Sequence, residues 1–121
     1  MLGLSATIRV FVAVAPTDLR KGYDGLAQLA REVAEQDPLS GHWFVFANRR
    51  RDRVKILYWD RDGFALWQKR LETGTFEFPK VIGEAAGVAI SATELSLILG
   101  GVALNAKRRP RYTTPEKSSG S

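Results

Sequence analysis

Short runs of β-branched and aromatic residues, separated by turn residues, recur along the chain and predict β-strands. Proline and glycine mark the breaks between them, as at Pro16, Pro38 and Gly41. The expected strands are residues 8–14 (IRVFVAV), 42–47 (HWFVFA), 53–59 (RVKILYW), 64–71 (FALWQKRL) and 75–79 (TFEFP). Residues 80–90 show little pattern, so we interpret them as a linker.

Two further segments have the spacing of amphipathic helices. In residues 23–36, apolar side chains recur at i, i+3, i+4 and i+7, which places them on one helix face. These side chains are Leu26, Leu29, Ala30 and Val33. Later in the chain, Ser91 and Glu94 have the spacing of a capping box, and Gly100 and Gly101 predict the end of a short helix.

Together these elements predict an α+β fold. We expect a mainly antiparallel sheet of about five short strands, with one packed helix and a short C-terminal helix. The chain has 121 residues, which favours a single domain, here placed at residues 1–104. Apolar residues almost vanish from residue 105 onward, so we expect 105–121 to be a basic disordered tail.

The strand pattern also divides the hairpin 53–71 into two faces, because strand side chains alternate. Turns centred on Arg61–Asp62 or on Asp62–Gly63 give the same division, since both loops have an even length. One face, expected to contact the helix 23–36, carries Val54, Ile56, Tyr58, Ala65, Trp67 and Lys69. The other changes from apolar near the turn to cationic at the far end, and carries Trp59, Leu57, Phe64, Leu66, Lys55, Gln68, Arg53 and Arg70.

Charge is segregated along this chain, whose formal net charge is +5. Residues 49–70 contain eight cations and three anions, and residues 105–121 contain five cations and one anion. Clustered arginines match phosphate geometry and predict contact with a polyanion such as DNA. The candidate DNA-binding residues are Arg49, Arg50, Arg51, Arg53, Lys55, Lys69, Arg70, Lys107, Arg108, Arg109 and Arg111.

Both basic segments also have a purely structural interpretation. Asp52, Asp60 and Asp62, together with water and salt, would neutralise the hairpin cations. The basic tail would simply keep the chain soluble. The sequence leaves these alternatives open.

The stretch TDLRKGYDGL, residues 17–26, combines charged residues and glycines before the first helix. Arg20 and Lys21 would favour an anion beside a helix N-terminus, or a partner protein. The structural alternative is that Thr17 or Asp18 caps a turn and that Arg20 pairs with an aspartate.

The composition gives little support for catalysis. Five aspartates, at positions 18, 24, 52, 60 and 62, are weak candidates for a metal-dependent nuclease, because two of them flank a tight turn. The chain has one histidine, His42, and no cysteine. We therefore expect no enzyme activity, no metal site and no cofactor. No apolar run is long enough to span a membrane, and we expect a cytoplasmic protein with no membrane partner.

Three long motifs resemble one known family. The segments 16–30 (PTDLRKGYDGLAQLA), 37–79 and 91–101 (SATELSLILGG) are similar to the small accessory protein, TnpB type and second open reading frame product, of IS-sixty-six family insertion sequences. The likeness covers about residues 7–104. It implies a role in bacterial DNA transposition beside a larger transposase, and it supplies no catalytic residue to carry over.

Two functions remain as alternatives. In the first, the chain is a non-catalytic accessory factor that binds DNA through the hairpin and the tail. In the second, it is an adaptor that docks the partner transposase without touching DNA, through Trp59, Phe64 and the segment containing Arg20 and Lys21. We also expect that the protein can associate with a second copy of itself.

Overall fold

The computed structural model describes residues 8–34, 38–80 and 85–100. Its elements follow one another in the order β1 (Val10–Ala13), α1 (Tyr23–Ala34), a 3-10 turn η1 (Pro38–Ser40), β2 (Trp43–Ala47), β3 (Arg53–Asp60), β4 (Gly63–Arg70), β5 (Gly87–Ile90) and α2 (Ala92–Leu99). The five strands form one sheet in the order β4-β3-β2-β1-β5. The pair β1–β2 is parallel and the other three pairs are antiparallel, so the predicted α+β class is confirmed.

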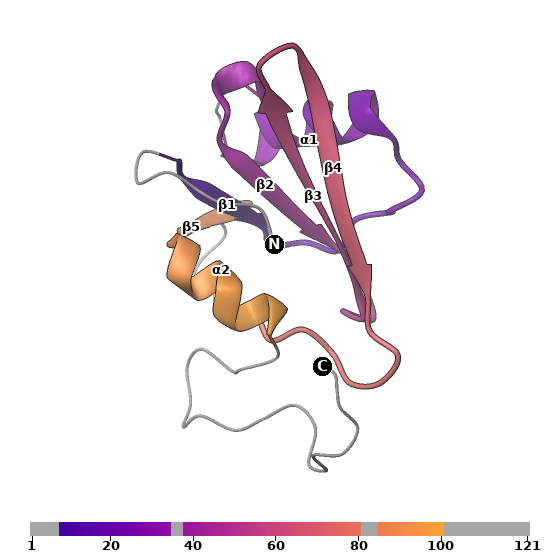
Figure 1. Cartoon of the computed structure of the whole chain (residues 1–121). Helices are drawn as coiled ribbons and strands as arrows, with labels where there is room; N and C mark the ends of the chain where they lie inside the picture. The colour runs from indigo at the N-terminus through magenta and orange to yellow at the C-terminus, as the bar shows by residue number, and fades with distance from the viewer. Residues whose placement is uncertain (1–7, 35–37, 81–84, 101–121) are drawn as a thin grey trace.

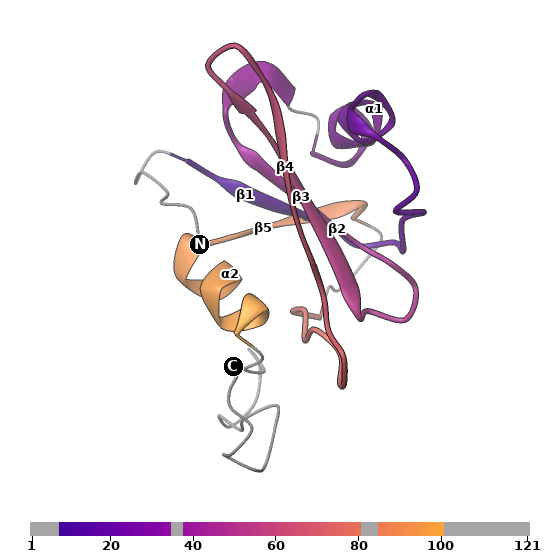
Figure 2. The same ribbon diagram turned by 45° about the vertical axis from the view of Figure 1, so that its right-hand side comes forward.

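The two helices cover opposite faces of the sheet, as Figure 2 shows from the side. On one face, Leu26, Ala27 and Ala30 of α1 pack against Phe11, Phe44, Phe46 and Leu57. On the other face, Leu95, Ile98 and Leu99 of α2 pack with Val10, Val45, Val54 and Ile56. Each face is therefore closed by one apolar helix stripe, and burial of these side chains is the main stabilising contribution.

The predicted helices form at the expected positions because their local signals agree with their packing. Leu26 and Ala30 are fully buried on the predicted stripe of α1. Before α2, the Ser91 hydroxyl accepts the Glu94 amide proton and the Glu94 carboxylate accepts the Ser91 amide proton. This is the predicted capping box, and it satisfies two donors that the helix leaves unpaired.

The strand prediction for residues 75–79 is wrong, and the linker prediction for residues 80–90 is wrong in part. Residues 75–79 are not a strand: the amide of Phe76 donates to the Arg51 carbonyl, and Phe76 packs under the sheet as part of a connecting segment. The fifth strand is β5, inside the stretch interpreted as a linker. The sequence pattern of this strand is weak because it begins with Gly87, where there is no room for a side chain. A Cβ at this position would lie 2.5 Å from Val33 Cγ1 of α1.

The assignment of the hairpin faces is confirmed in one respect and wrong in another. The register pairs Trp59 with Phe64 and Arg53 with Arg70, around a turn at Arg61–Asp62. The residues therefore share faces as predicted. However, α1 covers the face that carries Leu57, and the face that carries Val54 meets α2 instead. Alternation along the strands determines which side chains share a face. Which helix packs on that face depends on the topology of the whole chain.

Candidate nucleic-acid interface

The loop between β2 and β3 carries three consecutive arginines and is held by two polar side chains. Asn48 Oδ1 accepts the amide protons of Asp52 and Arg53, both at 3.1 Å. Asn48 Nδ2 donates to Asp52 Oδ1 at 2.7 Å. These bonds close the loop from inside, so its shape does not depend on the arginine side chains.

The Asp52 carboxylate serves mainly to close the loop, through its hydrogen bond from Asn48. The hydrogen bond from Asn48 lowers the pKa of the Asp52 carboxyl, and the charges of Arg50 and Arg53 add to the effect. Its nearest ion pair is with Arg50, whose Nε lies 4.0 Å away. Within the described residues, Arg49, Arg51, Arg53, Lys55 and Lys69 have no carboxylate oxygen within 4.0 Å. Most of the hairpin cations are thus not neutralised by close acids in the part of the chain that the structure describes.

The far end of the hairpin forms a shallow basic groove. Arg53 lies directly opposite Arg70, and Lys55 lies opposite Gln68. The groove has a volume of about 360 Å³ and is lined by Leu19, Arg53, Val54, Lys55, Gln68, Lys69, Arg70 and Glu72. Glu72 pairs with Arg70 at 3.4 Å, but both side chains are largely exposed, so this ion pair is weak.

The segment before α1 joins this surface. The Thr17 amide donates to the Ala47 carbonyl, and Lys55 Nζ lies 3.5 Å from the Lys21 carbonyl. The backbone of Lys21 therefore lies beside the Lys55 ammonium group, although 34 residues separate the two lysines. The sequence treats the two segments as separate candidates, and the structure brings them together.

Arg20 has a different role from Lys21. Its guanidinium pairs with Asp18 at 2.9 Å, and its backbone amide donates to the same carboxylate. This is the pairing that the structural alternative predicts. Hydrogen bonds from the Arg20 side chain and backbone lower the pKa of Asp18 to about 2, so the aspartate stays charged. Arg20 thus orders the turn before α1, and Lys21 is the cation of this segment that has no close acid within the described residues.

Two cations point to the other face of the sheet. Lys69 lies on the α2 side, where its Nζ is 3.4 Å from the Leu99 carbonyl in the last turn of α2. The guanidinium carbon of Arg51 lies 5.1 Å from the centre of the Phe78 ring. The predicted cation cluster therefore divides around the end of the sheet, with Arg53, Lys55 and Arg70 on the α1 side.

The aromatic pair Trp59 and Phe64 lies at the opposite end of the hairpin, next to the turn. Their rings meet edge to face at 5.1 Å, and Phe64 also packs against the cluster under α1. Both side chains are partly buried, and they do not join the basic groove.

Among the described residues, His, Asp and Glu side chains form no group of three that could hold a metal ion. No helix in the same residues combines the length and the apolar character needed to cross a membrane. The candidate residues of the tail, from Lys107 to Arg111, and the predicted boundary at residue 104 lie outside the described residues.

Sequence reasoning missed Asn48, which closes the arginine loop, and Phe78, which lies against Arg51. An asparagine directly before the arginines was an available signal, because asparagine side chains commonly bond to nearby backbone amides in turns. The contact with Phe78 had no local signal, since it joins residues 27 positions apart.

The fold and this surface define a small α+β protein with a five-stranded sheet and a helix on each face (Figure 1). An exposed basic groove lies at one end of the sheet. Residues 8–109 match the model of the family described as "IS66 Orf2 like protein", and the chain belongs to this family. Its members are accessory proteins of IS66 insertion sequences, so the chain has an accessory role in transposition.

Two curated relatives from Sinorhizobium fredii (strain NBRC 101917 / NGR234) are similar over most of their length. "Uncharacterized protein y4jC" is 37% identical over 117 residues, covering 97% of this chain and 98% of that protein. "Uncharacterized protein y4hO" is 38% identical over 102 residues, covering 84% of this chain and 87% of that protein. No solved structure matches the chain significantly.

Proposed function

We propose that this accessory protein binds the DNA backbone through the basic groove and through Arg49 and Arg50 of the adjoining arginine loop. The observation that carries the proposal is that Arg53 and Arg70 lie directly opposite each other, with Lys55 nearby on the same face. Among the described residues, neither Arg53 nor Lys55 has a carboxylate close enough to offset its charge. Like charges opposite each other in a sheet reduce stability. A phosphate backbone would offset that repulsion, because each neutralised phosphate also releases counterions.

The remaining parts of the proposal follow from the same chemistry. Arg49 and Arg50 extend the groove along the loop, and both side chains belong to exposed residues. The tail cations Lys107, Arg108, Arg109 and Arg111 would add further phosphate contacts. The protein would act without catalysis, in the cytoplasm, beside the transposase of the same element. Backbone contacts of this kind carry affinity and orientation, but no base sequence.

The experiment is a salt titration of binding to a mixed-sequence DNA duplex, followed by fluorescence anisotropy. Neutralising two phosphate contacts in the variant Arg53→Gln/Arg70→Gln should reduce the slope of log K against log salt by about 1 to 2 units. Binding at low salt should weaken accordingly. A truncation after Leu104 measures the contribution of the tail separately.

A matched control removes the same charge elsewhere. Arg9 precedes β1 at the other end of the sheet, and Arg31 lies in the last turn of α1. The variant Arg9→Gln/Arg31→Gln should keep the wild-type slope. Equal slopes for all three proteins, or no binding to DNA at low salt, would refute the proposed interface.

A further inference from the structure

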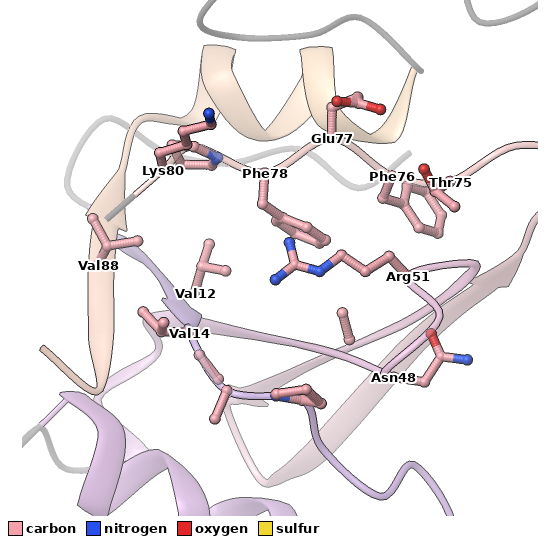
Figure 3. A pocket seen from close by; sticks show the side chains of 15 residues that line it. Val12, Val14, Asn48, Arg51, Thr75, Phe76, Glu77, Phe78, Lys80 and Val88 are labelled. Carbon is pink, nitrogen blue, oxygen red and sulfur yellow. The ribbon is translucent and has the colours of Figure 1, made fainter. Parts of the chain in front are cut away.

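A second hollow lies on the α2 side of the arginine loop, away from the basic groove. It has a volume of about 490 Å³ and opens between the ends of β1 and β2 and the segment 75–80. Its floor is aliphatic: Figure 3 labels Val12, Val14 and Val88 there, and Pro16 and Ala47 also line the hollow. We call this hollow, defined by those residues with Arg51 and Phe78, the Arg51 pocket.

One cation of the pocket, Arg51, is fixed in position by its backbone. Arg51 has a φ of 60°, a left-handed backbone conformation that residues other than glycine seldom adopt. Its amide donates to the Asn48 carbonyl at 3.1 Å, and its carbonyl accepts the Phe76 amide at 2.7 Å. With both backbone groups held and its guanidinium beside the Phe78 ring, the side chain has a defined direction.

That direction is into the pocket. In Figure 3 the Arg51 guanidinium points into the space between Phe78 and Val12, while Glu77 points away on the far side of its segment. Arg51 has no carboxylate oxygen within 4.0 Å among the described residues. The pocket thus offers guanidinium donors above an apolar floor.

We propose that the Arg51 pocket binds an extended peptide segment of a partner protein, in which a carboxylate side chain stands next to a branched apolar side chain. The carboxylate would accept paired hydrogen bonds from Arg51, a geometry that the planar guanidinium favours. The apolar side chain would lie on Val12, Val14 and Val88. The volume suits one or two side chains, within the range of small-ligand sites.

A nucleotide fits this pocket less well. Single-stranded bases bind by stacking on exposed aromatic faces, and the ring of Phe78 already faces Arg51. The aliphatic floor offers no such face. The inference does not depend on the proposed DNA contact, because the two surfaces use different side chains around the end of the sheet.

The test follows the valine methyl resonances of the full-length protein by NMR. The probes are a terminally blocked Leu-Glu-Leu peptide, the matched Leu-Gln-Leu peptide and a short oligothymidine. The acidic peptide should shift the methyl signals of Val12, Val14 and Val88 in a saturable way, and should bind about tenfold or more tightly than its amide counterpart. Equal binding of the two peptides, no saturable shift, or the same shifts with oligothymidine alone would each overturn the proposal.

Two variants separate charge from shape. Arg51→Gly removes the guanidinium and permits the left-handed backbone, and it should weaken binding of the acidic peptide about tenfold or more. Val14→Phe fills the floor without changing the charge and should also abolish peptide binding, while the salt slope of DNA binding stays at the wild-type value. Thermal melting of both variants confirms that they are folded. Undiminished peptide binding by either folded variant would place the peptide outside this pocket.

Discussion

At the scale of the residue, short-range hydrogen bonds decide which charges are available to a partner. Asp18 and Asp52 each lie within two residues of an arginine in the sequence. Each nevertheless mainly orders a turn: Asp18 through Arg20, and Asp52 through Asn48. The aspartates therefore hold backbone shape more than they neutralise the basic groove. The sequence suggests a turn cap for Asp18 and a neutralising role for Asp52, and only the hydrogen-bond partners show what each acid does.

The pairing of Asp18 with Arg20 predicts a specific titration. The pKa of Asp18, about 2 against an ordinary 3.8, should rise toward 3.8 in Arg20→Ala, because the largest cause of the lowering is the Arg20 side chain. Since the folded pKa is depressed, the order that this pair gives to the turn is complete above pH 3.8 and is lost as the pH falls through about 2.

Carbon-13 titration of the Asp18 carboxyl by NMR measures this shift. Lys21→Ala serves as the control, because the charge of Lys21 is the smallest of the causes that lower the pKa. An Asp18 pKa that does not change in Arg20→Ala, or that rises as much in Lys21→Ala, contradicts the assignment.

At the scale of the element, the junction of α1 and β5 depends on one glycine. A Cβ at Gly87 would lie 2.5 Å from Val33 Cγ1 and 2.9 Å from the Val33 carbonyl oxygen. The second contact is with backbone, which cannot rotate away. Close approach of the helix to the edge strand therefore requires a residue without a side chain at this position.

We expect Gly87→Ala to lower the free energy of unfolding by about 1–3 kcal/mol, because α1 or β5 must move to admit the methyl group. Urea denaturation measures the change. The matched control is Gly63→Ala, also in a strand, where an added Cβ has no heavy atom within 4 Å. That control should change stability by about 0.5 kcal/mol or less. A Gly87→Ala protein as stable as the control would show that α1 and β5 are not tightly packed.

At the scale of the whole molecule, the proposed DNA binding and the stability of the sheet oppose each other in the basic groove. Arg53 and Arg70 are exposed and lie directly opposite each other on β3 and β4. Their mutual repulsion therefore reduces the stability that the pairing of these two strands contributes. The sheet tolerates this repulsion because its two apolar faces are closed by α1 and α2. A site that binds a polyanion benefits from the same arrangement.

Reversing one of these charges should therefore separate the two properties. Arg53→Glu places an acid opposite Arg70, and it should raise the free energy of unfolding by about 0.5 kcal/mol at low salt. The same change should weaken DNA binding. Denaturation at about 0.1 M and 1 M salt tests the electrostatic origin, because screening should remove most of the gain. A variant that loses stability at low salt, or that binds DNA as well as the wild type, would contradict the proposed trade-off.

Much of the fold was predictable because its signals are local. The apolar stripe of α1, the capping box of α2 and the sharing of faces along β3 and β4 follow from spacing alone. Residues 75–79 show the limit of such patterns. Their alternation does bury Phe76, but the backbone bonds to the arginine loop and not to a neighbouring strand.

The sequence by itself therefore determined which side chains share a face, where both helices begin, and that positive charge gathers along the hairpin. Only the tertiary structure decided that α1 covers the Leu57 face, that Lys21 joins Lys55, and that Arg51 turns away from Arg53 toward Phe78. The physical reason is range: periodicity and capping act over a few residues, whereas pairing and coverage join segments tens of residues apart and are selected by the packing of the whole chain.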